Sequence, residues 1–275
     1  MPLPDADLHP VATGLAKETV DRHSSPQPLK LYAGWFCPFV QRVWLALEER
    51  GIPYQYVEVN PYHKGADLIS ANPRGLVPTL VVAPKKALYE STVLLEYLED
   101  KYPDHKPRLL PEDEFERARA RIWTDFVTSR VMPAFYRFLQ FQPGQFEDGE
   151  ARLDNLRGEY RGKLLEYAKE LDEEGPYFGG KEVGFVDLVL IPWVLRHWVF
   201  DRFKGGVGIP APGQGGDDEK VWVRWRKWVE ALEGRESIKN TTSEEQYYVP
   251  IYKTYADDVA QSELAKATRE GRGVP

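Results

Sequence analysis

The sequence LKLYAGWFCPFVQRVWLALEERG, residues 29–51, contains the signals that decide how the first part of the chain folds. Residues 29–33 alternate in polarity as a strand does, and a short turn follows them. Pro38 suits the first turn of a helix, because proline has no N–H to lose there and its φ is already helical. Gly51, followed by Pro53, ends that helix. Four apolar residues share one face of it: Val40, Val43, Trp44 and Leu47.

Cys37 is the only cysteine in the chain, and it stands where this helix begins. Free N–H groups and the helix dipole favour a thiolate at such a position. A thiol whose pKa is lowered is a nucleophile near neutral pH. A lone cysteine can instead be a small buried apolar residue. The position at a helix start therefore makes Cys37 a candidate catalytic nucleophile.

Composition and charge exclude several classes of protein. The chain has 275 residues, of which 42% are hydrophobic and 29% are charged, as in ordinary globular proteins. A net charge of −7 argues against a nucleic-acid partner or an anionic-membrane binder. A single cysteine excludes an intramolecular disulfide, and the first 28 residues lack the apolar core of a signal peptide. No apolar run reaches membrane-spanning length, so we expect a cytoplasmic protein.

The pattern along the chain predicts an α/β half followed by an all-α half. Strands at 29–33 and 54–59 flank a helical crossover, which predicts a parallel pair. A hairpin over 79–90 and a helix from about 91 to 102 complete this half. Helical runs follow at 113–141, 151–173, 186–203 and 218–233, and Pro133 should kink or end the first. The expected divisions are an irregular extension at 1–28, an α/β domain at 29–103, a linker at 104–112 and a helical domain at 113–275.

Several motifs, in their order along the chain, resemble those of the cytosolic glutathione transferases, and the first resembles the omega class. They are CPFVQR at 37–42, Lys64, NPRGLVP at 72–78, YES at 89–91 and GFVD at 184–187. The resemblance spans about residues 29 to 260. It implies a thioredoxin-like N-terminal domain at 29–103 that binds glutathione, followed by an all-helical C-terminal domain that binds the acceptor.

The resemblance also implies which residues bind glutathione. A cis peptide bond before Pro78 would turn the Val77 backbone toward the tripeptide, which could pair with it as an added strand. At the helix start, N–H groups and the Ser91 hydroxyl would hold the γ-glutamyl carboxylate, and Glu90 would hold its ammonium group. Taken singly, Ser91 also suits a plain helix cap. Two further contacts are implied: Lys64 to the glycyl carboxylate and Phe39 beside the sulfur.

Acceptor binding is expected in the second domain, where Arg196, Tyr247 and Tyr252 are the candidates. The alternative is that the tyrosines simply pack the core. Other classes use an early tyrosine to activate glutathione, but the place of Tyr32 inside a strand favours core packing. Asp187 resembles the family's buried helix-capping aspartate. Because Gly184 stands where Ser or Thr is usual, the capping box is expected to be incomplete.

The implied activity is that of an omega-like glutathione transferase, a glutathione-dependent thiol transferase and reductase. Cys37 would form a mixed disulfide with glutathione, and external glutathione would release it because the chain has no second cysteine. The acceptor would be a small hydrophobic or glutathionylated compound, in keeping with detoxification. The family also implies a homodimer. Histidine spacing and glycine spacing predict no metal and no nucleotide.

Two alternatives share these sequence features. One is a non-enzymatic carrier of apolar ligands, a ligandin, on the same fold. The other is a protein like the chloride intracellular channels, which have a similar Cys-Pro-Phe-x-Gln-Arg run. Lys30, Gln41 and Arg42 make residues 29–47 a poor membrane span. Turnover of a glutathionyl substrate distinguishes the enzyme from the carrier, and liposome insertion tests the channel.

Overall fold

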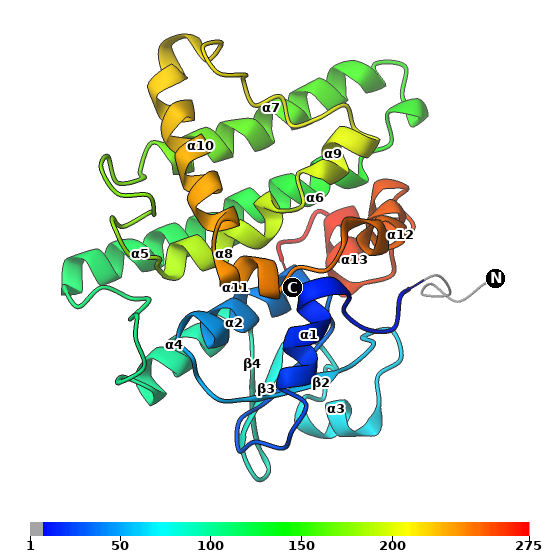
Figure 1. Cartoon of the computed structure of the whole chain (residues 1–275). Coiled ribbons are helices and arrows are strands. Elements are labelled where there is room, and N and C mark those ends of the chain that lie inside the picture. Colours follow the sequence, from blue (N-terminus) through cyan, green and yellow to red (C-terminus); the bar gives the residue numbers. More distant parts are fainter. Residues whose placement is uncertain (1–7, 275) are drawn as a thin grey trace. The chain divides into compact units, whose positions relative to one another are not determined.

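The computed structural model describes residues 8–274, which form two compact units. The first, here called the sheet unit, contains the described residues up to Pro111 together with Glu233–Tyr248. The second, the helical unit, contains Glu112–Leu232 and the chain from Val249 onward. Figure 1 labels the elements of both units. The predicted order, a thioredoxin-like domain followed by a helical domain, is confirmed.

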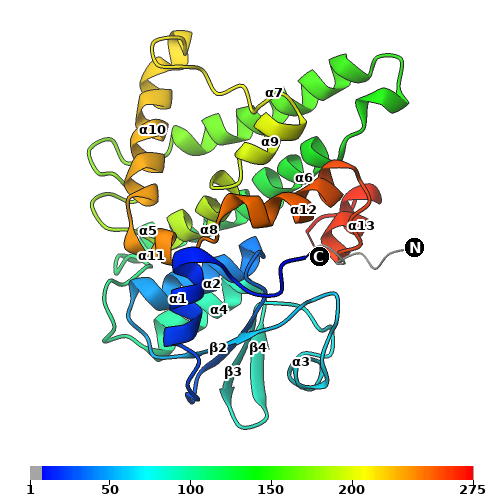
Figure 2. The ribbon, with the colours of Figure 1, turned by 45° about the vertical axis from the view of Figure 1, so that its right-hand side comes forward.

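The sheet unit is built on four strands in the order β2-β1-β3-β4. Strand β1 is parallel to β2 and antiparallel to β3. Strand β3 is antiparallel to β4, and these two strands lie side by side in Figure 2. The parallel pair and the hairpin are therefore as the sequence predicts. The strands are β1 (Lys30–Ala33), β2 (Gln55–Glu58), β3 (Thr79–Ala83) and β4 (Lys86–Tyr89). The helices between them are α2 (Pro38–Glu49) and α3 (Ala66–Ala71), and α4 (Ser91–Lys101) follows β4.

Helix α2 is buried on more than one face. Its predicted apolar residues Val40, Val43, Trp44 and Leu47 have no exposed surface. Gln41 is also buried, and its amide group donates to the Thr241 carbonyl at 3.2 Å. Helix α4 packs against α2, and so does α11 (Glu236–Asn240). This double cover explains why the polar residue Gln41 loses contact with water.

The start of the chain differs from the expected irregular extension at 1–28. Residues Gly14–Arg22 form helix α1, which packs against α11, while residues 1–7 lie outside the described part. The Thr13 N–H donates to the Ser243 hydroxyl at 3.1 Å, and the Glu244 N–H donates to the Thr13 hydroxyl at 3.1 Å. Residues 233–248, expected in the helical domain, thus pack with α1 and α2 in the sheet unit.

The helical unit contains the predicted long helices. Helices α5 and α6 are joined by a π-helical segment, Val127–Val131, and Pro133 lies in the first turn of α6. A helix can widen there because proline has no N–H to bond. The helices are α5 (Glu114–Phe126), α6 (Met132–Gln140), α7 (Gly149–Ala168), α8 (Phe185–Val194), α9 (Trp198–Phe203), α10 (Glu219–Glu233), α12 (Glu245–Ala256) and α13 (Glu263–Arg269). The last two were not individually predicted, and α12 begins in the sheet unit.

Asp187 is fully buried at the start of α8 and accepts three hydrogen bonds. Its donors are the N–H of Phe178 at 2.8 Å, the N–H of Gly184 at 2.7 Å and the indole N–H of Trp228 at 2.6 Å. Burial nevertheless raises its pKa to about 6. The bond from Gly184 is the aspartate half of a capping box; glycine has no side chain to supply the other half.

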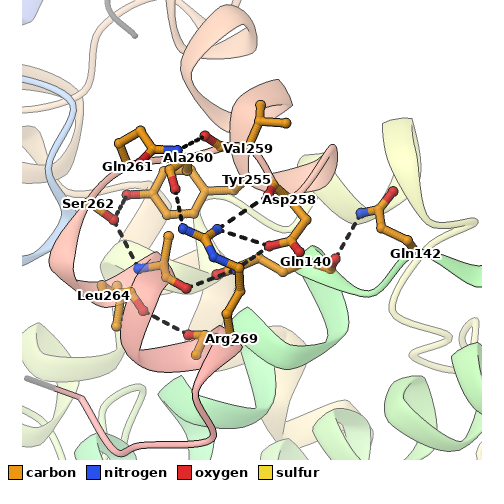
Figure 3. A network of polar contacts seen from close by, with 12 residues as sticks. Gln140, Gln142, Tyr255, Asp258, Val259, Ala260, Gln261, Ser262, Leu264 and Arg269 are labelled. Atoms are coloured by element: carbon orange, nitrogen blue, oxygen red, sulfur yellow. Dashed lines mark hydrogen bonds and ion pairs between the residues drawn. The ribbon is translucent and has the colours of Figure 1, made fainter.

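The C-terminal helices are attached to the end of α6 by the polar network shown in Figure 3. The Gln140 amide donates to Asp258 at 2.9 Å, and the Arg269 guanidinium donates to the same carboxylate at 3.1 Å. Arg269 also donates to the Ala260 carbonyl at 2.8 Å, and the Gln142 amide donates to the Ala256 carbonyl at 2.7 Å. The network therefore fixes α12 and α13 within the helical unit.

Candidate active site

Cys37 is the residue immediately before helix α2, and its backbone is extended, with φ −76° and ψ 121°. Its N–H donates to the Gly34 carbonyl at 2.9 Å, and its own carbonyl accepts the Gln41 N–H at 3.0 Å. Pro38 occupies the first helical turn, as the sequence predicts. The thiol thus lies, partly buried, at the positive end of a helix dipole, where a thiolate is stabilised.

The backbone at Val77 faces the thiol. The Val77–Pro78 peptide bond is cis, as the resemblance implies, and the Cys37 sulfur lies 3.9 Å from the Val77 carbonyl oxygen. The Asn72 amide holds this loop by donating to the Leu76 carbonyl at 3.2 Å and the Thr79 hydroxyl at 3.0 Å. The candidate nucleophile and the expected peptide-binding backbone therefore lie close together.

Ser91 is the first residue of α4, and a buried arginine contacts it. The Arg42 guanidinium donates to the Ser91 hydroxyl at 3.1 Å, and Arg42 is 1% exposed. The same guanidinium lies 5.4 Å from the centre of the Phe39 ring. Sequence reasoning quoted Arg42 within a motif but gave it no role. Its spacing, four residues after Pro38 on the helix that begins the site, is the signal that could have found it.

Glu90 has a backbone conformation that is unusual for a residue other than glycine. Its φ is +73°, in the left-handed region, directly before α4. Such conformations concentrate at functional sites, where the surrounding structure maintains them. The Glu90 carboxylate pairs with the Arg74 guanidinium at 3.1 Å, with both side chains exposed to solvent. The carboxylate is therefore directed outward, where it can meet a ligand's ammonium group.

Lys64 and Glu90 are connected through Arg74, a residue that sequence reasoning did not select. The Lys64 ammonium group donates to the Arg74 carbonyl at 2.9 Å. Gly75, with φ +62°, is required beside it, because a Cβ there would lie 2.5 Å from the Lys64 side chain. Arg74 lies on the loop that follows α3, and Lys64, before α3, and Glu90, before α4, both contact it. Two cations and one carboxylate thus lie together, a suitable arrangement for a zwitterionic peptide.

Tyr32 is buried in β1 and is poorly suited to activate a thiol. Burial raises the pKa of its phenol above the ordinary value, and the charge of Asp67 adds to this effect. A raised pKa disfavours the ionised phenolate. Tyr32 therefore packs in the core, as its place inside a strand predicts.

The three acceptor candidates do not all fall in one unit. Arg196 and Tyr252 are buried in the helical unit, where the guanidinium lies 5.8 Å from the centre of the tyrosine ring. Tyr252 also contacts Trp198 edge to face, at 5.9 Å between ring centres. Tyr247 belongs to the sheet unit and packs on His9, with 4.5 Å between ring centres. Arg196 and Tyr252 thus form a pair, and both are partly occupied with core packing.

The described residues contain neither a cluster suited to a metal ion nor a membrane-spanning helix. Within residues 8–274, no group of three or more His, Cys, Asp or Glu side chains is arranged to hold a metal ion. Over the same residues, none of the helices combines the length and the apolar character needed to cross a bilayer.

Comparison with known proteins gives concordant matches. Residues 36–101 match the family model of the glutathione S-transferase N-terminal domain. Glutathione S-transferase omega-1 of Sus scrofa is 32% identical over 187 residues, which are 67% of this chain and 74% of that protein. Glutathione S-transferase U2 of Arabidopsis thaliana is 34% identical over 62% of this chain and 74% of its own length.

Solved structures give the same result. The crystal structure of glutathione transferase Omega 3C from Trametes versicolor has a TM-score of 0.76 and 41% identity, and the match covers 92% of this chain and all of that one. The structure of rice GST1 in complex with glutathione has a TM-score of 0.68 and 27% identity, covering 84% of this chain and all of that one.

Proposed function

Because this chain belongs to the glutathione transferase family and is omega-like within it, we propose that it is a glutathione-dependent thiol transferase with Cys37 as its nucleophile. One observation supports this most directly. The single thiol of the chain lies at the start of α2, 3.9 Å from the Val77 carbonyl that precedes the cis proline. Glutathione transferases use glutathione as co-substrate, and a tripeptide paired with Val77 would present its sulfur to this thiol.

The proposed reaction is two successive thiol–disulfide exchanges. The Cys37 thiolate attacks the glutathione sulfur of a glutathionylated acceptor, the acceptor's disulfide bond breaks, and the acceptor leaves as a thiolate that takes a proton. A second glutathione thiolate then attacks the Cys37–glutathione disulfide. This step releases oxidised glutathione and restores the Cys37 thiolate. Because the chain has no second cysteine, the second glutathione must come from solution.

Glutathione would bind through the residues described above. The Val77 backbone would pair with its cysteinyl unit, and the start of α4 with Ser91 would accept the γ-glutamyl carboxylate. Glu90 would pair with the ammonium group, and Lys64 would neutralise the glycyl carboxylate. Phe39, held beside Arg42, would pack near the sulfur.

We further propose the finer properties that accompany this activity. The acceptor is a small hydrophobic or glutathionylated compound, with Arg196, Tyr252 and Tyr247 as its candidate contacts. The compartment is the cytoplasm, where a reduced glutathione pool keeps a lone thiol active. The chain forms a homodimer. In support of the dimer, α5 exposes Phe115 and Ile122, and the sheet unit exposes Tyr89 and Val93.

Incubation with oxidised glutathione tests the proposal directly. We expect the intact mass to rise by one glutathionyl group at neutral pH, and dithiothreitol to reverse the change. The variant Cys37→Ala should show no increase. An unchanged wild-type mass would mean that Cys37 is not an accessible, activated thiol.

Two substitutions of Cys37 separate reduction from conjugation. Both Cys37→Ala and Cys37→Ser should lose reductase turnover, because neither side chain supplies a thiolate. Only the serine hydroxyl can donate to the thiolate of bound glutathione and lower its pKa, so Cys37→Ser should keep or gain conjugation to an electrophilic aromatic. Full reductase turnover in Cys37→Ala would contradict the assignment and make Tyr32 or Tyr89 the next candidate. Stoichiometric ligand binding without turnover in the wild type would favour the carrier.

Two variants at the start of α4 test the glutathione site. Glu90→Ala and Ser91→Ala should each weaken glutathione binding about tenfold or more, since hydrogen bonds to charged groups contribute about 1.5–3 kcal/mol. Asp100→Ala, in the exposed last turn of the same helix, should bind glutathione as the wild type does. Titration calorimetry on the three variants measures this. Wild-type affinity in both site variants would place the γ-glutamyl group elsewhere.

A further inference from the structure

The turn that leads to Cys37 is held by three separate segments of the sheet unit. The Cys37 N–H closes it by donating to the Gly34 carbonyl, with Trp35 and Phe36 between. The Trp35 N–H donates to the Glu58 carboxyl group at 3.0 Å, and the Trp35 indole N–H donates to the His9 carbonyl at 2.9 Å. The Trp35 ring packs edge to face on Tyr248, at 4.8 Å between ring centres. Trp35, only 2% exposed, is therefore fixed through both its backbone and its side chain.

Of the hydrogen bonds described for Trp35, only the one to Glu58 involves the backbone of the turn. Glu58 is the last residue of β2, and the next residue, Val59, also lies close to the turn. The Val59 N–H donates to the Ala33 carbonyl at 2.7 Å, and a Cβ on Gly34 would lie 3.3 Å from the Val59 carbonyl. The turn thus lies directly against the end of β2. A carboxyl group bonded to the second residue of a four-residue turn fixes the direction in which the fourth residue, Cys37, enters α2.

The surroundings of Glu58 keep its carboxyl group neutral. Burial raises the pKa of Glu58 to about 8, against the opposing effect of the Trp35 N–H, the Tyr56 hydroxyl and the Ala12 N–H. These neighbours come from the turn, from β2 itself and from the chain before α1, and none is a cation. At neutral pH the group accepts a hydrogen bond without placing a negative charge beside the turn. A nearby negative charge would disfavour a thiolate.

We propose that Glu58 is a positioning residue for Cys37: its carboxyl group holds the Gly34–Cys37 turn and so sets the reactivity of the thiol. Glu58 does not touch the reacting sulfur; it acts through Trp35. The inference adds a residue to the proposed function, but its central claim concerns only the reactivity of the Cys37 thiol.

Alkylation of the lone thiol by iodoacetamide, followed by intact mass over pH 6 to pH 9.5, tests this role. The groups added to the wild type beyond those added to Cys37→Ala report on Cys37, because the chain has no other cysteine. Glu58→Gln keeps a neutral oxygen that can accept from Trp35, so its rate at pH 7 should stay within about twofold of the wild-type rate. Glu58→Ala removes the acceptor, and at pH values below the thiol pKa its rate should fall about threefold or more, as a half-unit rise in that pKa requires.

The shape of the pH profile gives a second, independent readout. The pH profile of the wild-type rate should show two ionisations, that of the thiol and that of Glu58 near pH 8. The profile of Glu58→Gln should show the ionisation of the thiol alone. Gln55→Ala, on the same strand, should keep both wild-type ionisations. Circular dichroism and thermal melting show whether each variant is folded, and if Glu58→Ala is not, the wild-type and Glu58→Gln profiles decide.

The contradicting results are equally specific. A folded Glu58→Ala with the wild-type rate would overturn the positioning role, and so would a Glu58→Gln rate at pH 7 well below the wild-type rate, because glutamine keeps the acceptor. Because alkylation needs no glutathione, this outcome is distinct from failure of the proposed function. That failure would appear as normal alkylation of Cys37 together with reductase turnover that survives in Cys37→Ala.

Discussion

At the residue scale, three helix starts in this chain use their N–H groups in different ways. At α8, Asp187 accepts from three buried donors within the helical unit, so its bonds serve folding. At α2, Cys37 is the residue immediately before the helix, and it is partly exposed. At α4, Glu90 is held with φ +73° and its carboxylate faces solvent. The side chain at the start of α8 thus stabilises the core, whereas those at the starts of α2 and α4 are accessible to a ligand.

Replacing Asp187 by alanine should destabilise the helical unit strongly. Three buried donors, on Phe178, Gly184 and Trp228, would lose their acceptor, and each unsatisfied group costs about 1–3 kcal/mol. We therefore expect the free energy of unfolding to fall by about 3 kcal/mol or more, measured by urea denaturation. Asp217→Ala, at an exposed position, is the matched control. A loss below about 1 kcal/mol would contradict the structural role.

His197 should make the protein sensitive to acid. Burial lowers its pKa from 6.5 to about 3, and its ring contacts the Tyr160 hydroxyl at 2.8 Å. As the pH falls from 6.5 toward 3, the unfolded chain binds a proton that the folded protein does not, so stability is lost in that window. His197→Gln cannot titrate and should lose less stability between pH 7 and pH 5. Urea midpoints at the two pH values measure the difference, and parallel losses in both proteins would refute it.

At the element scale, local signals predicted the sheet unit well and its non-local additions poorly. Strand alternation and Pro38 located β1 and α2 because those signals act within a few residues. Helix α1 was missed because it buries only Ala16 and Thr19, which leaves almost no apolar pattern to detect. The packing of residues 233–248 on α1 and α2 depends on partners some 200 residues away, such as Gln41 and Thr241.

The residues of the candidate site also divide into those with a local sequence signal and those without one. Cys37 was predicted from its place at a helix start, and Val77 and Ser91 from motifs that a family resemblance identifies. Arg42, Arg74 and Glu58 were not assigned roles, because their partners are brought close only by the fold. Glu58 is the clearest case: a glutamate at a strand end is typical of a solvated face, and its burial against Trp35 and Ala12 has no local signal.

Glu49 should be the main attachment of residues 233–248 to α2. Its carboxylate accepts from the Arg235 guanidinium and from the Ser237 hydroxyl. Glu49→Ala would leave both donors without this acceptor, so we expect the free energy of unfolding to fall by about 1–3 kcal/mol. Amides of residues 236–240 should exchange with solvent faster than in the wild type. Glu18→Ala, exposed on α1, is the control, and unchanged exchange in Glu49→Ala would show that the other contacts suffice.

At the scale of the whole molecule, the exposed apolar side chains bear on the state of assembly. Phe115 and Ile122 on α5 are 73% and 66% exposed and lie seven residues apart, two turns along one face. In the sheet unit, Tyr89 and Val93 are also exposed around the β4–α4 junction. Exposed apolar groups of this size favour burial against another protein surface. A second copy of this chain is the partner that the proposed homodimer supplies.

Charged residues on α5 should therefore dissociate the dimer. Burial of a Phe or Ile side chain contributes about 1.5–3 kcal/mol, so Phe115→Glu with Ile122→Glu should weaken association at least about a hundredfold. Sedimentation velocity over a concentration series measures this. The control variant Val259→Glu introduces the same charge at another exposed apolar residue of the helical unit, and it should remain dimeric. A wild type that sediments as a monomer at every concentration would contradict the dimer. A dimeric double variant would place the interface away from α5, because two carboxylates buried without partners in an apolar contact cannot be offset by the remaining surface.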